Sequence, residues 1–140
     1  MSTAARRDGA PTFVNPPGVG APIGAYSHLA RSGNTYFIAG QVSVDRDDQV
    51  VGVGDFARQL TQTFKNIGDI LLSAELGFHN IAQMTTYITV RDDVDRFYAA
   101  RAELFPSLFG EAMYPPNTLL IVSGLVRPEL LVEVQVIATR

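Results

Sequence analysis

Two strand-like stretches near the C-terminus decide the fold, YPPNTLLIVSG at residues 114–124 and LLVEVQVIA at residues 130–138. Side chains of a β-strand alternate between its two sides, so each stretch predicts two distinct faces. One face of the first strand carries Asn117, Leu119, Ile121 and Ser123. One face of the second carries Glu133, Gln135 and Ile137. A pocket lined by these faces would be apolar and nearly uncharged.

Strand and helix patterns alternate in the residues before these two strands. Strands are expected at residues 26–31, 36–42 and 82–90, because β-branched and aromatic residues are frequent there and Ser32-Gly33-Asn34 is a turn signal. Residues 12–14 are expected to begin the first ordered strand.

Two helices are expected from the spacing of apolar residues by three or four. The first begins at Asp55 as N-cap and ends at Gly77 as C-cap. The second begins at Asp93 or Asp95, and Pro106 is expected to end or kink it.

The resulting order, β-β-α-β-α-β-β, predicts an α+β domain in which both helices pack on one face of a mixed sheet. Two helices cannot cover both faces of a sheet rich in Val, Ile, Leu and Tyr. An uncovered apolar face is unusual for a monomer, so the pattern predicts self-association.

Composition restricts the class of protein. With 140 residues, of which 46% are hydrophobic, the chain is expected to form one domain over residues 12–140 after a disordered leader at residues 1–11. A net charge of -3 disfavours nucleic-acid binding. There are no cysteines, and no apolar signal or anchor segment is seen near Met1, so we expect a cytoplasmic protein that does not bind membranes.

No cofactor or metal is expected. Gly52-x-Gly54-x-x-Ala57 has the spacing of a dinucleotide-binding turn, but the repeated βαβ pattern that such a turn requires is missing. His28 and His79 are the only histidines, and neither has a second metal ligand near it in sequence.

Arg101 is the most interesting cation, since a guanidinium is the usual clamp for a small carboxylate. It follows Phe97 by one helical turn and is therefore expected near the apolar face of the second helix. The alternative, which the sequence favours, is a structural role in which Arg101 covers apolar surface or forms an ion pair.

Five motifs occur in the order and at the separations found in one family: GAYSH at residues 24–28, FIAGQV at 37–42, Asn66-Ile67, TTYIT at 85–89 and VEVQVIA at 132–138. From about Gly24 to Arg140 the chain thereby resembles the RidA/YjgF family of reactive-intermediate deaminases. The resemblance implies a chorismate-mutase-like fold, a homotrimer whose sheets pack into a central barrel, and ligand clefts at the subunit interfaces. That assembly would cover the open face of the sheet.

The resemblance also implies site residues. In deaminating members an arginine at the start of the penultimate strand grips the substrate carboxylate, and a glutamate in the last strand handles a water molecule. Carried over residue by residue, the family's tyrosine is Tyr26 and its glycine is Gly40 beside Gln41. The arginine position falls on Asn117 and the glutamate position on Gln135, so both charged positions are expected to be amides.

These amides weigh against the family's standard 2-iminoacid deaminase activity. An amide lacks the positive charge of a guanidinium and its two parallel N–H donors. Losing one charge-assisted hydrogen bond weakens the binding free energy by about 1.5–3 kcal/mol. Leu119 and Ile121, on the same face as Asn117, favour a ligand that is more apolar and less anionic. Arg101 is the candidate replacement for the missing cation.

The sequence leaves two functions open. The first is hydrolysis or deamination of an imine, enamine or related metabolite at a cleft between subunits. Its polar lining would be Tyr26, Gly40, Gln41, Asn117 and Gln135, with Tyr26, Asn117 and Gln135 as the catalytic candidates. The second is a trimer that binds a small-molecule metabolite without turning it over. A ribonuclease ranks last, because the chain lacks a basic groove.

Overall fold

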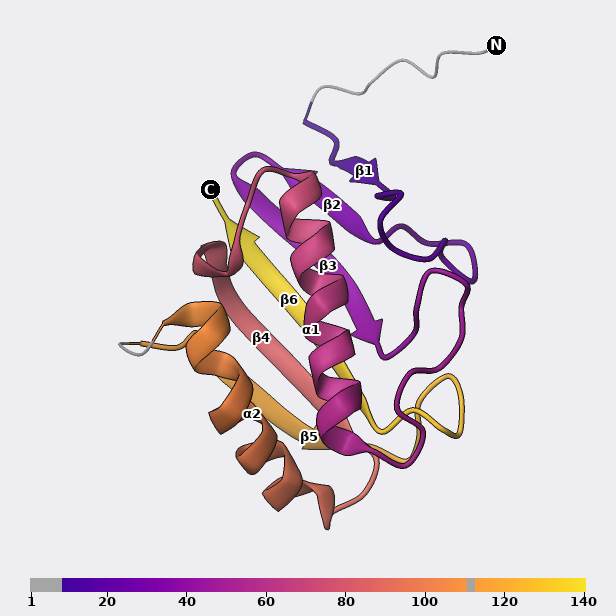
Figure 1. Ribbon diagram of the computed structural model, residues 1–140. Helices are drawn as coiled ribbons and strands as arrows, with labels where there is room; N and C mark the ends of the chain where they lie inside the picture. Colours follow the sequence, from indigo (N-terminus) through magenta and orange to yellow (C-terminus); the bar gives the residue numbers. More distant parts are fainter. Residues whose placement is uncertain (1–8, 111–112) are drawn as a thin grey trace.

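The computed structural model describes residues 9–110 and 113–140. Most of the expected disordered leader, residues 1–8, lies outside the described residues, and Thr12 begins the first strand. Figure 1 shows the chain in the order of its elements. The strands are β1 (Thr12–Val14), β2 (Leu29–Ser32), β3 (Thr35–Val42), β4 (Ile81–Ile88), β5 (Asn117–Ile121) and β6 (Val132–Thr139). The helices are α1 (Phe56–Ser73), the short 3-10 helix η1 (Phe78–Asn80) and α2 (Asp93–Phe109).

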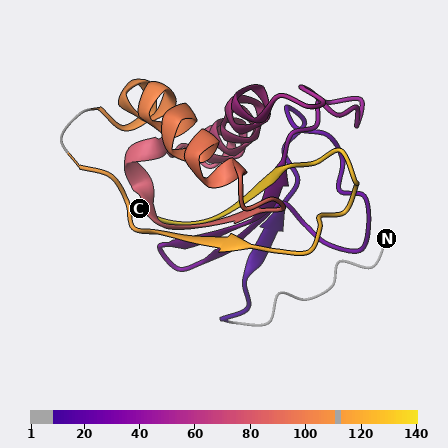
Figure 2. The same cartoon turned by 90° about the horizontal axis from the view of Figure 1, so that it is seen from below.

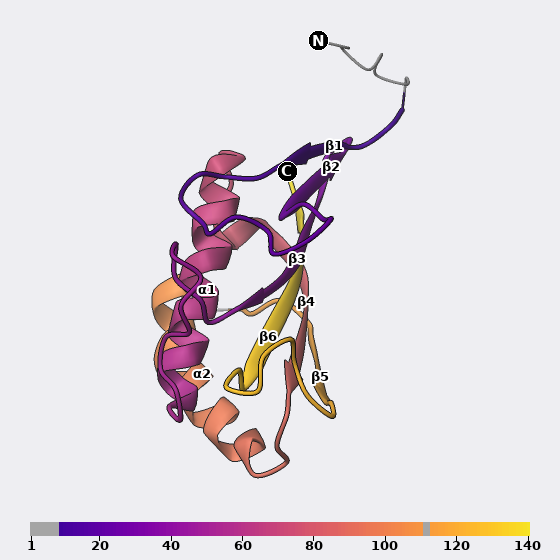
Figure 3. The same cartoon turned by 90° about the vertical axis from the view of Figure 1, so that its right-hand side faces the viewer.

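The described strands form one six-stranded sheet in the order β1-β2-β3-β6-β4-β5. β4 and β5 run parallel, whereas the other neighbours are antiparallel, so the sheet is mixed as expected. Both α1 and α2 lie on the same face of the sheet (Figures 2 and 3). The predicted α+β fold with two helices on one face is confirmed.

The hydrophobic core fills the space between the helices and the sheet. Val132, Val134 and Val136 of β6 are buried there, as are Leu60 and Ile67 of α1. The other face of the sheet has no helix against it (Figure 3). On that face of the single chain, Phe37 is 46% exposed and Leu120 is 44% exposed.

α1 begins as predicted and ends earlier than predicted. The Asp55 side chain accepts a hydrogen bond from the Arg58 backbone nitrogen at 3.0 Å, as an N-cap should. The predicted C-cap at Gly77 is wrong, because Glu75 takes the left-handed conformation (φ 59°) that ends the helix. The Leu76 nitrogen then donates a hydrogen bond to the Leu71 carbonyl oxygen at 2.9 Å. This bond pairs a carbonyl group in the last turn of the helix, where carbonyl groups lack partners within the helix.

Of the two outcomes expected at Pro106, an end or a kink of the helix, the end is wrong, because α2 continues to Phe109. Proline in the last turn removes one backbone hydrogen bond near a helix end, where few bonds remain to be lost. Phe105 and Phe109 pack against each other with ring centroids 5.1 Å apart, which holds the last turn in place. Gly110, at φ 77°, ends the helix and donates to the Pro106 carbonyl.

Candidate functional site

A β-bulge interrupts β3 where the candidate site residues lie. Ile38 pairs with Val136 and Gln41 pairs with Val134, so Ala39 and Gly40 together oppose the single residue Gln135 of β6. A bulge bends its strand and leaves a residue outside the regular ladder, and bulges occur often beside active sites. The bulge therefore presents Gly40 next to the open-face side chains of β6.

Glu133 occupies the space that Gly40 leaves free. A Cβ atom built on Gly40 would lie 2.5 Å from the Glu133 Oε2 atom, so the carboxylate lies against bare backbone. Across residues 9–110 and 113–140 this carboxylate has neither a hydrogen bond nor an ion pair. Burial raises the pKa of Glu133 by disfavouring its charged form.

Sequence reasoning placed Glu133 on the same face as Gln135 but did not include it among the candidate site residues. A signal was present, because Glu133 is the only acidic residue of β6 and lies two residues before Gln135. What the sequence did not provide was the bulge, which brings Gly40 against this carboxylate.

The side chain of Gln41 supports the bulge from the helix side of the sheet. It is buried and donates to the Ala39 carbonyl at 3.1 Å, and it lies 3.2 Å from the Nδ1 atom of the buried His28. The Nε2 atom of His28 is 2.7 Å from the Gly20 carbonyl oxygen. Gln41, expected to contact the ligand, therefore holds the backbone of the site in this chain and does not present its side chain to the open face.

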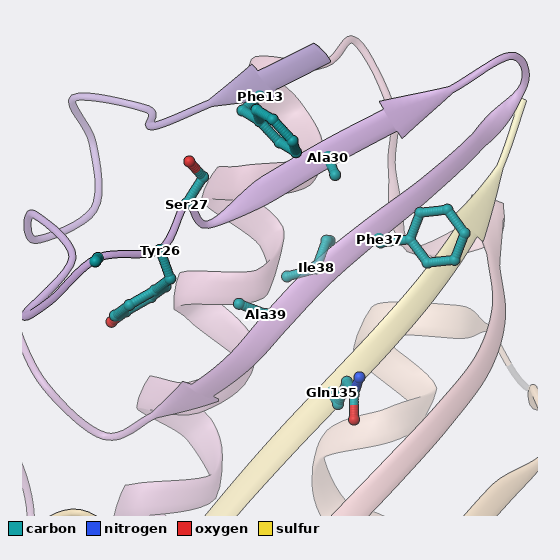
Figure 4. A pocket seen from close by; sticks show the side chains of 9 residues that line it. Phe13, Tyr26, Ser27, Ala30, Phe37, Ile38, Ala39 and Gln135 are labelled. Carbon is teal, nitrogen blue, oxygen red and sulfur yellow. The ribbon is translucent and has the colours of Figure 1, made fainter. Parts of the chain in front are cut away.

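A first cleft, here called the bulge cleft, opens on the helix-free face of the sheet and has a volume of about 530 Å³. Figure 4 shows Phe37 and Gln135 on neighbouring strands in this cleft, with Tyr26 and Ser27 from the preceding loop. Tyr87 of β4 donates from its hydroxyl group to the Gln135 Oε1 atom at 3.3 Å. The cleft is lined by Phe13, Ala25, Tyr26, Ser27, Ala30, Phe37, Ile38, Ala39 and Gln135.

A second cleft, here called the edge cleft, lies between α2 and the start of β5 and has a volume of about 540 Å³. It brings together Arg101 and Asn117, two of the predicted ligand-binding residues. The Asn117 Oδ1 atom accepts a hydrogen bond from the Thr86 hydroxyl group at 2.7 Å. The lining residues are Tyr98, Arg101, Ala102, Phe105, Tyr114, Pro115 and Asn117.

The strand face that carries Asn117 and the strand face that carries Gln135 lie on opposite sides of the sheet. Asn117 pairs with the buried Met84, whereas Gln135 pairs with Thr85, the next residue of β4. Successive residues of β4 point to opposite faces, so Asn117 is on the helix side and Gln135 on the open side. Within one chain, Asn117 and Gln135 therefore line different clefts.

Leu119 and Ile121 share the helix side with Asn117, but neither lines the edge cleft. Leu119 packs against the hydrophobic core, and Ile121 is 41% exposed near the end of β5. Within the described part of the chain, no group of three histidine, cysteine or carboxylate side chains is arranged to hold a metal ion. No helix there is long and apolar enough to cross a membrane.

Gly40→Ala tests the contact between the bulge and Glu133. We expect the added methyl group to push the carboxylate away, because it would come within 3.0 Å of Glu133 Cδ and Oε2. The flexible side chain can move, so the thermal midpoint should change little, while an activity that depends on the position of this carboxylate should fall. Gly33→Ala is not a matched control because of its positive φ, whereas Gly124→Ala adds a methyl group in open space. An unaltered activity in Gly40→Ala would contradict a role for this contact.

Comparison with known protein families gives a clear match. The family model described as endoribonuclease L-PSP matches residues 18–140. The chain belongs to this family. The resemblance to RidA/YjgF proteins drawn from the sequence motifs is thereby confirmed, together with the RidA-like fold.

Relatives within the family share most of the chain. A RutC family protein of Pyrococcus horikoshii is 32% identical over 117 residues, covering 84% of this chain and 88% of the relative. A protein of Acinetobacter baylyi named 3-aminoacrylate deaminase RutC is 28% identical over 126 residues, covering 90% and 95%. The crystal structure of the Rid family protein YyfA from Yersinia pestis superposes with a TM-score of 0.82 at 25% identity, covering 94% and 100%.

Proposed function

We propose that the chain forms a homotrimer that hydrolyses an imine or enamine metabolite at clefts between subunits. The observation that carries the proposal is the partially buried Glu133 carboxylate against the Gly40 bulge, on a sheet face left open by the helices. The 3-aminoacrylate deaminase among the relatives supports the same class of reaction.

The positions of the two clefts support a site made from two subunits. The bulge cleft spans β1, β2, β3 and β6 on the open face, whereas the edge cleft lies at β5, the opposite end of the sheet. A head-to-tail contact places different surfaces of neighbouring copies against each other, and it closes into a ring when the rotation allows. In such a ring, the β5 edge of one copy would complete the bulge cleft of the next.

Glu133 supplies the base that imine hydrolysis requires. Its raised pKa makes the carboxylate a stronger base than an ordinary glutamate at neutral pH. The carboxylate takes a proton from a water molecule as the water oxygen bonds to the imine carbon, and the carboxyl group then gives this proton to the nitrogen, which completes an amino alcohol. The hydroxyl proton of the amino alcohol passes to the nitrogen as the C–N bond breaks and the C=O bond forms, and ammonia leaves a carbonyl product. An enamine first becomes the imine by moving a proton from its nitrogen to its carbon, and then follows the same course.

The direct test measures ammonia release from a panel of imines generated in situ by an amino-acid oxidase, with and without the purified protein. We expect faster release for at least one imine and the matching 2-oxo acid in equal amount. A scavenger such as semicarbazide should intercept less imine when the protein is present. Equal rates with and without the protein for the whole panel, and for 3-aminoacrylate, would refute the enzymatic proposal.

A second function, metabolite binding without turnover, is favoured by Asn117. This amide lies where the family resemblance implies a substrate-gripping arginine, and an amide holds a carboxylate less strongly. Thermal stabilisation of the protein by a metabolite that is recovered chemically unchanged would support this function. Turnover that is lost in Asn117→Ala or Gln135→Ala would exclude it.

A further inference from the structure

We infer that the edge cleft selects an anion with an aromatic or bulky apolar body, and that Arg101 is the group that binds the anion. The inference rests on the proposed function only in taking this cleft as part of the substrate site.

The guanidinium group of Arg101 lies against two aromatic rings. Its guanidinium carbon lies 4.7 Å from the ring centroid of Tyr98 and 5.1 Å from that of Phe97. A guanidinium that lies over an aromatic ring keeps the N–H groups at its edge free to donate. Within residues 9–110 and 113–140, Arg101 has neither an ion pair nor a hydrogen bond through its side chain.

Asn117 adds a second donor to the same cleft. Its Oδ1 atom is occupied by the Thr86 hydroxyl group, so the side-chain nitrogen is the group left for a ligand. The described lining contains one arginine and no acidic residue. A cation and an amide donor without an opposing carboxylate favour an oxyanion over a neutral or cationic group.

The rest of the lining is apolar and aromatic. Tyr98 and Tyr114 are each 47% exposed at the cleft, and the ring centroid of the buried Phe105 lies 5.9 Å from that of Tyr114. Rings in this arrangement offer large apolar contact area to a flat ligand. A volume of about 540 Å³ falls in the range of clefts for small organic molecules, about 300–1,000 Å³, and exceeds what a two- or three-carbon acid would fill.

Three probes separate the two features of the ligand. 3-Phenylpropionate carries both the anion and the ring, propionate carries only the anion, and 3-phenylpropanamide carries the ring without the charge. We expect calorimetry or thermal shift to show the tightest binding for 3-phenylpropionate. Equal binding of the neutral amide, or no binding of 3-phenylpropionate, would overturn the inference.

Arg101→Gln should weaken binding of 3-phenylpropionate by about 10- to 100-fold, the usual effect of losing one charge-assisted hydrogen bond, and leave the neutral amide unaffected. Arg101→Lys keeps the positive charge but loses the planar pair of N–H donors. Its affinity for 3-phenylpropionate should lie between those of the unmodified protein and Arg101→Gln. Arg91→Gln makes the same change of charge outside the cleft and serves as the control. Unchanged affinity in Arg101→Gln, or an equal loss in Arg91→Gln, would overturn the role of Arg101.

The results also separate this inference from the proposed function. Binding that depends on Arg101 without ammonia release from any imine would retain the ligand class and refute the enzyme. Ammonia release from small imines that Arg101→Gln does not alter would retain the enzyme and refute the ligand class.

Discussion

Glu133→Gln is expected to reduce ammonia release by about 100-fold or more and, at neutral pH, to make the folded protein more stable. A general base commonly contributes about 10²- to 10⁴-fold to a rate, and glutamine cannot accept the proton. The same carboxylate is partly buried beside Gly40, and placing its charge there is unfavourable. One substitution should therefore move activity and thermal midpoint in opposite directions.

The pH dependence follows from the raised pKa of Glu133. Because the folded state holds this proton more tightly than the unfolded state, the stabilising effect of the neutral carboxyl group is fully present at low pH. It is lost as the pH rises through the folded-state pKa. The stability gained by Glu133→Gln should thus appear above that pKa and vanish below the pKa of an ordinary glutamate. Activity of the unmodified protein should fall on the acid side at a higher pH than an ordinary glutamate would give.

Glu129→Gln is the matched control, because it makes the same change at an exposed position in the loop before β6. Its activity and thermal midpoint should stay close to those of the unmodified protein. The measurements are kcat/KM for ammonia release and the thermal midpoint, each across a pH series. Full activity in Glu133→Gln would show that Glu133 is not the base of the proposed reaction.

Much of the fold could be predicted from the sequence, because the apolar residues repeat at strand and helix periods. Val132, Val134 and Val136 alternate with polar residues in β6, and the structure buries all three. The position of Asp55 just before the first helix predicts an N-cap, and the hydrogen bond from the Arg58 backbone nitrogen to its side chain is observed. Local chemistry of this kind does not depend on which strands become neighbours.

The candidate site was harder to predict because it depends on contacts between distant residues. Alternation shows that Asn117 and Leu119 share a face, but it does not show which side of the sheet that face takes. That side is set by pairing with β4, where Asn117 meets Met84. The bulge at Gly40 likewise appears only when β3 is paired with β6, and without it nothing in the sequence connects Gly40 with Glu133.

Phe37→Glu is expected to convert the proposed trimer into a folded monomer without activity. Phe37 lies on the open face of the sheet and lines the bulge cleft, outside the core between sheet and helices. In a trimer whose sheets pack together, the substitution would bury carboxylates without partners, which is strongly unfavourable. In a monomer the same side chain can remain in water, so the fold itself should persist.

Light scattering distinguishes the two states, since the chain has a mass of 15.2 kDa and a trimer would have three times that mass. Circular dichroism should show unchanged secondary structure in Phe37→Glu. Leu72→Glu is the control, because Leu72 is 71% exposed on α1, on the helix side of the sheet away from the proposed interface. It should leave both mass and activity unchanged. A Phe37→Glu variant that stays trimeric would place the interface elsewhere, and a fully active monomer would show that each chain holds a complete site.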